Sequence, residues 1–311
     1  MLYTKLENTT LQQIIQQFDI APLLQWQVLE GGAENTNILL QTTQQKLVLT
    51  ICERKTVAET TILVDLLRHL EAHHFKTTMI IPNKSGQTIS FYNKKPIVLK
   101  KYIAGKIVNK PTTELLEQIG STIGQLHSLP TPDYLPKAYS YGQQVFATLS
   151  NTEISHPFVD WLTDMHTHIK SNLDNSLPKA LIHGDVFFSN VVVDPLGKPI
   201  IIDFEEACYY YRMYDIGMAI VGLCNVEGTI DFSKATPLMR GYEQIIALEK
   251  LEKERLHFFI GYAATATAFW RFRQFNILAP TPSRKNTYLE MKNIADEMRK
   301  KSQKNGNRFR R

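Results

Sequence analysis

Short apolar runs separated by polar turns dominate the chain up to about residue 105. Such runs are typical of strands in an antiparallel sheet. Two stretches in this region instead repeat their apolar residues every three or four positions, which predicts helices at residues 11–18 and 57–70. Thr56 and Glu59 form a capping box at the start of the second helix, and we assign Glu59 to that role. We expect strands at residues 26–29, 38–40, 46–51, 79–82, 88–92 and 96–103.

After residue 105 the apolar residues follow a helical period. Pro130, just before them, and Pro132 and Pro136 within them make residues 131–138 a loop. A sheet region followed by helices is typical of an α+β fold. We therefore expect a nucleotide-binding sheet region at residues 1–103, a mainly helical region at residues 104–298, and a solvated, frayed basic tail at residues 299–311. The predicted helices of the second region are residues 115–126, 157–173, 216–223, 237–247 and 249–275.

One stretch, residues 180–215, carries a dense set of polar residues at predicted strand ends. An apolar run leads into His183-Gly184-Asp185, and Asn190 follows five residues after Asp185. A β-branched strand at residues 191–193, a turn with Pro195 and Gly197, and a second strand at residues 200–202 then lead to Asp203-Phe204-Glu205. This pattern predicts a hairpin that brings Asp185, Asn190 and Asp203 close together.

These side chains suit metal-assisted phosphoryl transfer. Asp185 can accept the proton of an attacking hydroxyl, and Asn190 and Asp203 can hold Mg²⁺ against the phosphates of ATP, because Mg²⁺ prefers oxygen ligands. The spacing D-x-x-x-x-N followed by a strand ending in Asp-Phe repeats the catalytic loop and metal site of protein kinases. Isolated acidic residues at strand ends are usually helix caps or surface groups. Here, however, Asp185, Asn190, the hairpin strands and Asp203-Phe204 follow one another in the order found in protein kinases.

A second polar segment, around Gly32, Glu34, Asn35, Thr36 and Asn37, lies between two predicted strands. Glycine allows backbone N–H groups to approach phosphate oxygens, and the Asn and Thr side chains add donors, so this turn can cover the phosphates of a nucleotide. Gly-Gly turns also join many ordinary hairpins, so the assignment depends on the site downstream.

The residue that grips the α- and β-phosphates is not evident. Kinases carry a lysine on the third strand, where this chain has Thr50. Arg54, Lys46 and Lys100 are alternative cations. The backbone of Lys101, Tyr102 and Ile103 could pair with adenine where the last strand ends, although an ordinary edge strand would have the same sequence.

Composition narrows the class of protein. The 311 residues are 43% hydrophobic and 10% aromatic, as in globular proteins, and no apolar run approaches the roughly 20 residues that span a bilayer. The start of the chain lacks the pattern of a signal peptide, and the three cysteines form no C-x-x-C pair, so a reducing cytoplasm fits best. The net charge of +5 is concentrated in the tail, where Phe309 is a single aromatic residue among the basic ones, which makes nucleic-acid binding the weakest interpretation of the sequence.

The motif residues resemble a known superfamily. His183-Gly184-Asp185 with Asn190 and Asp203-Phe204-Glu205 is similar to the aminoglycoside phosphotransferase and choline kinase group, which has a bilobal protein-kinase-like fold. Further segments resemble the homoserine kinase branch of that group, in which threonine also stands where kinases have lysine. These segments are residues 34–37, residues 47–54, Gly241-Tyr242-Glu243, and Phe269-Trp270 with Arg273.

The resemblance implies an ATP- and Mg²⁺-dependent kinase acting on an amino-alcohol, L-homoserine, in threonine biosynthesis. For this reaction we expect Arg273 to bind the substrate carboxylate, although a surface arginine whose stem lies on apolar residues would have the same sequence. We expect Glu205 to contact the substrate or to support a second metal ion, and Asp215 to brace the catalytic loop. Many relatives have His-Ala-Asp and a different sequence after the metal aspartate, so choline, a sugar or an aminoglycoside stays open as the acceptor. A non-catalytic nucleotide-binding regulator is the remaining alternative, and the chain is expected to be a monomer or a homodimer.

Overall fold

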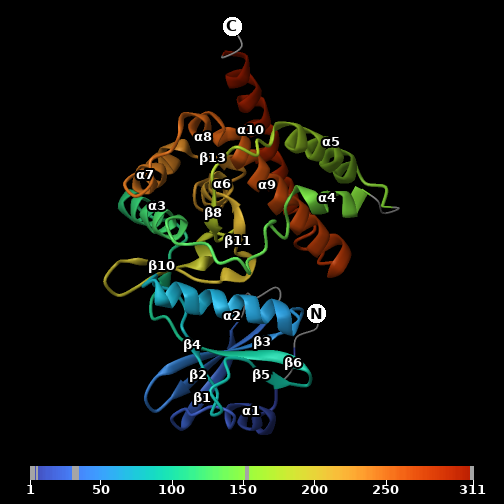
Figure 1. Ribbon diagram of the computed structural model, residues 1–311. Coiled ribbons are helices and arrows are strands. Elements are labelled where there is room, and N and C mark those ends of the chain that lie inside the picture. The colour runs from blue at the N-terminus through green and yellow to red at the C-terminus, as the bar shows by residue number, and fades with distance from the viewer. Residues whose placement is uncertain (1–3, 5, 30–34, 151–153, 309–311) are drawn as a thin grey trace. The chain divides into compact units, whose positions relative to one another are not determined.

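In the residues that are described, one antiparallel sheet and two helices build the first of two units, Met1–Gly105, of the computed structural model (Figure 1). The second unit, Lys106–Arg311, begins close to the predicted change at residue 104. The structure describes residues 4, 6–29, 35–150 and 154–308.

The sheet of the first unit has the order β1-β2-β3-β6-β4, and β5 also pairs with β6. Every pair is antiparallel, as the short alternating runs predict. Because successive side chains of a strand point to opposite faces, the sheet buries apolar residues on both sides. The strands are β1 Leu23–Leu29, β2 Asn35–Thr42, β3 Lys46–Cys52, β4 Ile80–Ile81, β5 Ser90–Tyr92 and β6 Lys95–Lys101.

Each helix of this unit contributes to one of two apolar clusters. Helix α1, Asn8–Ile15, begins and ends earlier than the sequence predicts, and its Leu11 and Ile14 pack in a cluster with residues such as Ile38 and Leu49 of the strands. Helix α2, Val57–Ala72, contributes Val64 to a smaller cluster with Cys52 and Val98. The predicted capping box of α2 is confirmed, because the Thr56 side chain accepts a hydrogen bond from the Glu59 backbone N–H while Glu59 accepts one from the Thr56 N–H.

The second unit is mainly helical, as predicted. The sequence predicts one helix over residues 249–275, but the chain forms two, with a break at Arg255, and then a π-helical turn, Arg273–Leu278. Its strands are β7 Lys106–Ile107, β8 Lys179–Ile182, β9 Val191–Val193, β10 Pro199–Ile201, β11 Cys208–Tyr211, β12 Asn225–Val226 and β13 Thr229–Ile230. Its helices are α3 Thr113–His127, α4 Gln143–Ser150, α5 Pro157–Asn172, α6 Arg212–Leu223, α7 Phe232–Glu243, α8 Lys250–Glu254, α9 Leu256–Phe272 and α10 Tyr288–Arg308.

Helix α9 forms the centre of this unit and lies against α6 and α10 (Figure 1). Twelve of its 17 residues are buried, so it is apolar on all sides, as expected of a helix inside a protein core. Within the described ranges, none of the helices combines the length and the apolar character needed to cross a membrane.

Helices α3 and α7 pack closely because glycines stand at their contact. A methyl group on Gly120 would lie 1.9 Å from the Leu238 carbonyl oxygen, and one on Gly241 would lie 1.8 Å from that of Glu117. Any larger residue would therefore force the two backbones apart. This close approach brings the C-terminal ends of the two helices side by side.

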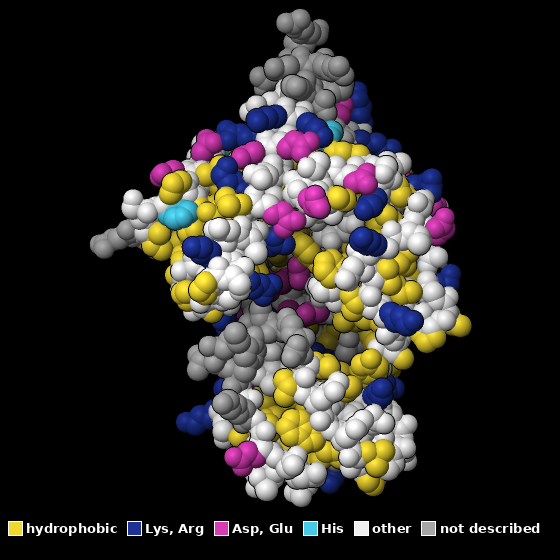
Figure 2. All heavy atoms as spheres, turned by 180° about the vertical axis from the view of Figure 1, so that it is seen from behind, with side chains coloured by type: hydrophobic (Ala, Val, Ile, Leu, Met, Phe, Trp, Pro, Cys, Tyr) yellow, Lys and Arg dark blue, Asp and Glu magenta, His cyan; other side chains and the backbone are white. Residues whose placement is uncertain are grey.

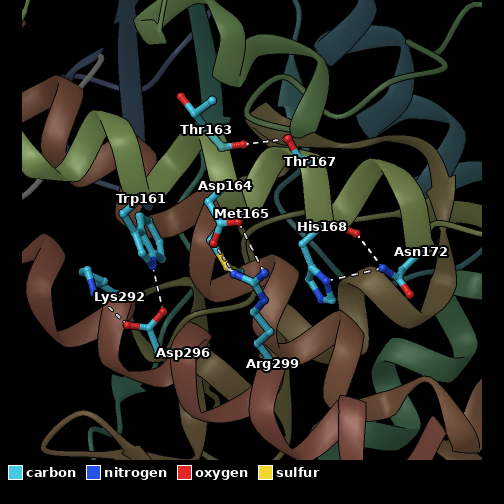
Figure 3. A network of polar contacts seen from close by, with 10 residues as sticks. All are labelled: Trp161, Thr163, Asp164, Met165, Thr167, His168, Asn172, Lys292, Asp296 and Arg299. Carbon is cyan, nitrogen blue, oxygen red and sulfur yellow. Dashed lines mark hydrogen bonds and ion pairs between the residues drawn. The ribbon is translucent and has the colours of Figure 1, made fainter. Parts of the chain in front are cut away.

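The sequence predicts a frayed tail at residues 299–311, but residues 299–308 continue helix α10. Residues 309–311 lie outside the described residues. Figure 3 shows why its middle part is held: the Trp161 indole N–H of α5 donates to Asp296 at 2.7 Å, and Arg299 pairs with Asp164. Met298 and Ile294 are fully buried. Basic side chains are interspersed with acidic ones over the helical unit on the face in Figure 2. The sequence signal was misleading because Arg299, the first of the tail charges, forms an ion pair with Asp164 of α5, a helix distant in the chain.

Candidate active site

The predicted hairpin of residues 191–202 forms as β9 and β10. The strands pair antiparallel, with Val191 opposite Ile201 and Val193 opposite Pro199. Asn190 directly precedes β9, and the Ile202 N–H, after β10, donates to the Asn190 carbonyl at 2.9 Å. The two strand ends that carry the polar residues are thus adjacent.

Asn190 holds the carboxylate of Asp185. Its Nδ2 donates to the Asp185 Oδ2 and to the Asp185 carbonyl oxygen, both at 2.8 Å. The amide orientation follows from these two acceptors, because only the NH₂ group can donate to both. The Asn190 Oδ1 therefore points away from Asp185, where it can accept a hydrogen bond or bind a metal ion.

His183 connects the loop of residues 183–190, which carries Asp185, to the residue that follows β10. Its ring is fully buried; Nε2 lies 2.9 Å from the Ile202 carbonyl oxygen, and the Asp185 N–H donates to Nδ1 at 3.1 Å. Nδ1 must be unprotonated to accept, so the ring is neutral with its proton on Nε2. Burial lowers the pKa of His183, which keeps it in this form. The backbones that carry Asp185 and Asp203 are thus held by one ring.

Asp215, in the first turn of α6, braces the same loop. Its carboxylate accepts hydrogen bonds from the N–H groups of His183 and Gly184, at 2.9 and 2.7 Å, and contacts His127 Nε2 at 3.0 Å. Burial alone would raise the pKa of Asp215, but the hydrogen bonds from the His127 side chain and from the His183 backbone N–H stabilise the ionised form and hold the pKa below its ordinary value. Asp215 is therefore ionised and acts on the loop backbone, as the sequence predicts.

Gly184 has a backbone conformation that other residues rarely adopt, with φ of +84°. A methyl group there would also lie 2.9 Å from both the Glu206 carbonyl oxygen and the Tyr139 ring. Gly197, in the turn of the hairpin, has a similar φ of +77° but no atom within 4 Å of such a methyl group. The two glycines differ in crowding rather than in backbone strain.

We expect Gly184→Ala to lower kcat at least tenfold, because both the strain and the clash act on the loop that carries Asp185. Gly197→Ala is the matched control: the strain alone should cost about 1–2 kcal/mol of stability and leave kcat unchanged. Steady-state kinetics and denaturant titration of both variants measure this difference. Equal kcat values in the two variants would contradict it.

Negative charge is concentrated around Asp185. Burial raises the pKa of Asp185, and the charges of Asp203 and Glu206 raise it further, to about 7, although the Asn190 hydrogen bond opposes this. Asp203 follows β10 in a left-handed conformation, with φ of 70°, which costs about 1–3 kcal/mol for a residue other than glycine. Such strain is typical of residues at functional sites.

This set of donors fits a magnesium ion shared with a nucleotide. Among the described residues, no three His, Cys, Asp or Glu side chains are arranged to hold a metal ion by themselves. Mg²⁺ usually takes one or two carboxylates and completes its coordination with substrate phosphates and water. The Asn190 Oδ1, Asp203 and Glu205 are the oxygen donors that could serve, and a cation would relieve the repulsion that Asp185 experiences.

In the first unit, the predicted nucleotide-binding residues point to opposite faces of the sheet. The Thr50 hydroxyl donates to Asn37 Oδ1 at 2.7 Å, so a neutral pair occupies the place of the kinase lysine. Thr36, one position before Asn37, donates instead to Glu53, which also pairs with Lys95 at 2.5 Å. The Thr36 side chain is therefore engaged on the other face. Asn35 starts β2, whereas Gly32 and Glu34 lie outside the described residues.

The predicted adenine-binding backbone is partly engaged. The Lys101 N–H donates to the Met79 carbonyl at 2.9 Å, and the Tyr102 N–H approaches the Lys46 carbonyl at 3.3 Å. Of these three residues, only Ile103 has an N–H without a backbone acceptor in the part of the chain that is described. The adenine contact through the backbone of these three residues stays a prediction, and the Ile103 N–H is the donor that these bonds leave available for it.

Several residues near Asp185 escape prediction from the sequence. Glu206 accepts a hydrogen bond from the Ser140 hydroxyl, and the ring of Tyr139 packs on Gly184. The only sequence signal for Glu206 is its position beside Glu205, and residues 139–140 fall in a stretch with no motif.

Arg273, predicted to bind substrate, is exposed at the start of the π-helical turn. The neighbouring Arg271 pairs with Glu290 at 2.8 Å.

Comparison with known proteins gives three findings. A family model described as "Phosphotransferase enzyme family" matches residues 25–259. A homoserine kinase of Caulobacter vibrioides is 27% identical over 269 residues, which cover 82% of this chain and 83% of that protein. Curated relatives with the same name include one from Methylobacillus flagellatus, 26% identical.

Solved structures share the fold at low identity. A microcompartment-associated aminopropanol kinase superposes with a TM-score of 0.76 at 15% identity, covering 96% of this chain and 99% of the other. An amicoumacin kinase in complex with AMP-PNP, Ca²⁺ and its ligand gives a TM-score of 0.75, also at 15% identity, covering 94% and 93%. The predicted α+β, protein-kinase-like fold is confirmed by these likenesses.

Proposed function

We propose, from the premise that the chain belongs to the phosphotransferase enzyme family, that it transfers the γ-phosphoryl group of ATP to the side-chain hydroxyl of L-homoserine. The chain is a phosphotransferase of the kinase type, acting on an alcohol group. The narrower choice of homoserine is supported by curated relatives named homoserine kinase. The observation that carries the proposal is Asp185, a carboxylate held by Asn190 with a pKa near 7.

Asp185 acts as the proton acceptor in this proposal. The acceptor oxygen forms a bond to the γ-phosphorus while the bond from phosphorus to the β,γ-bridging oxygen breaks and ADP leaves. The proton of the hydroxyl passes to the Asp185 carboxylate, and burial of this side chain raises its pKa above that of an exposed aspartate, which makes it a stronger base. His183 and Asp215 keep the loop in one position, so that most of the acceleration comes from orientation.

The metal and the nucleotide are assigned to separate sets of residues. Asn190 and Asp203, with Glu205, would hold Mg²⁺. A bound Mg²⁺ ion would neutralise negative charge on the phosphate oxygens. Asn35, Asn37 and Thr50 would contact the nucleotide, together with the undescribed Gly32 and Glu34. The cation for the α- and β-phosphates stays open among Lys46, Arg54 and Lys100.

An acceptor panel tests the function. The purified chain is incubated with ATP, Mg²⁺ and separate solutions of homoserine, serine, choline, aminopropanol, a hexose and an aminoglycoside, and the phosphorylated product is identified by mass spectrometry. We expect O-phosphohomoserine with the highest kcat/KM. Preference for another acceptor would overturn homoserine as the substrate. Binding of ATP with no product from any acceptor would favour a regulator.

The proposed role of Arg273 makes a separate prediction. Arg273→Ala should raise the KM for homoserine at least tenfold and leave the KM for ATP within twofold, because only the acceptor presents a carboxylate to this guanidinium. Arg240→Ala, which removes an exposed arginine of α7 that pairs with Glu117 of α3, is the control and should change neither constant. An unchanged homoserine KM in Arg273→Ala would remove the assignment.

A further inference from the structure

Two buried side chains connect the brace of the catalytic loop to a helix outside the site. The Tyr242 hydroxyl of α7 lies 3.0 Å from Nδ1 of His127, and Nε2 of the same ring lies 3.0 Å from Asp215 Oδ2. The side chains of His127 and Asp215 are fully buried, and so is Tyr242. The glycine contacts between α3 and α7 bring the two rings into this edge-to-face contact, with centroids 5.5 Å apart.

The direction of each hydrogen bond follows from counting protons. Asp215 is ionised and can only accept, so His127 Nε2 must carry a proton. The buried Tyr242 hydroxyl must also donate, and no acceptor other than His127 Nδ1 lies within reach of it in the described part of the chain. Nδ1 is then an acceptor and His127 is neutral. Only this arrangement gives a hydrogen-bond partner to each donor and acceptor that joins Tyr242, His127 and Asp215.

We propose that Tyr242 is a positioning residue for phosphoryl transfer: its hydroxyl fixes the proton of His127 on Nε2, which fixes the carboxylate of Asp215 against the loop that carries Asp185. The proposal rests on the role of Asp185 as the proton acceptor. Asp215 accepts three donors, two from the loop backbone and one from His127. Of these three, only the His127 donor can change its proton arrangement without unfolding the loop.

Removing the Tyr242 hydroxyl leaves Nδ1 as a buried acceptor without a donor. The ring of His127 can then turn, move its proton or take a second one, and each of these changes the direction or charge of the contact with Asp215. The Asp215 carboxylate loses its fixed orientation, and the N–H groups of His183 and Gly184 are held less strictly. Because Asp185 follows directly, its distance from the reacting hydroxyl varies, while the residues that bind nucleotide and acceptor are unaffected.

The experiment compares Tyr242→Phe with a matched control, Tyr211→Phe. Tyr211 is also buried and also loses one hydrogen bond, from its hydroxyl to Asn175 at 2.7 Å. We expect Tyr242→Phe to lower kcat about tenfold with both KM values within twofold of wild type, and Tyr211→Phe to lower stability without lowering kcat. An equal kcat in Tyr242→Phe and wild type, or an equal loss in both variants, would overturn the proposal.

Two further readouts separate positioning from a loss of packing. In ¹⁵N-histidine spectra, the signal that disappears in His127→Gln should show the Nε2–H form in wild type and a changed proton arrangement in Tyr242→Phe. In the His127→Gln background, Tyr242→Phe should lower kcat less than twofold, because the histidine through which Tyr242 acts on Asp215 is already absent. A full tenfold loss in that background, or an unchanged histidine signal, would contradict the proposal.

These outcomes are distinct from failure of the homoserine assignment. The histidine spectra need no acceptor, and the kcat ratio between variants can be measured with whichever hydroxyl compound the panel identifies.

Discussion

Asp185→Asn is expected to lower kcat by about 10³, because asparagine keeps the shape of the side chain but cannot accept the proton of the acceptor hydroxyl. ATP binding should be retained, since an oxygen at position 185 can still accept from the Asn190 amide. Kinetics with the identified acceptor and titration with a nucleotide analogue measure the two effects. Asp160→Asn, which neutralises an exposed carboxylate in the first turn of α5, is the control.

The same substitution should raise the melting temperature at pH 8. In the folded chain the pKa of Asp185 is about 7, above the ordinary value of 3.8, so ionisation of Asp185 at pH 8 opposes folding. As the pH falls below 7, the folded wild type takes up this proton and regains the stability. We therefore expect Asp185→Asn to melt a few degrees higher at pH 8 and to lose that advantage towards pH 4. A variant that is less stable at pH 8 would contradict the electrostatic account of the site.

Asp215→Asn should affect both the fold and the reaction. The carboxylate receives three donors from His127, His183 and Gly184, and an amide can offer its oxygen on one side only. Its NH₂ group would face at least one N–H group, which leaves a buried donor without an acceptor. We expect a loss of about 3–5 kcal/mol in the free energy of unfolding and at least a hundredfold loss in kcat.

Denaturant titration and kinetics at one pH test this expectation. The control is Asp231→Asn: Asp231 caps α7 through the Ser233 N–H at the surface, where asparagine caps equally well. Wild-type stability in Asp215→Asn would show that the loop does not depend on this carboxylate. A stable variant with normal kcat would also remove the basis of the Tyr242 proposal.

Local patterns in the sequence were sufficient for the elements that carry the site. The hairpin around Asn190 and Asp203 was predictable because β-branched runs flank a turn with Pro195 and Gly197, and such turns form from neighbouring residues. The capping box of Thr56 and Glu59 was predictable for the same reason. Helices α4 and α10 were not predicted; α10 is held by burial of Met298 and Ile294 and by the ion pair of Arg299 with Asp164 of α5, contacts that depend on residues distant in the chain.

The sequence by itself determined the order of the elements and which residues could perform chemistry, since helix periods, turns and motif spacing depend on residues close together in the chain. The tertiary structure alone decided how those residues behave. The pKa of Asp185 is set by burial and by charges from other segments, and the proton on His127 is set by Tyr242 and Asp215, 115 and 88 residues away in the chain. Contacts over such separations leave no periodic signal, because they arise only when α3, α6 and α7 pack together.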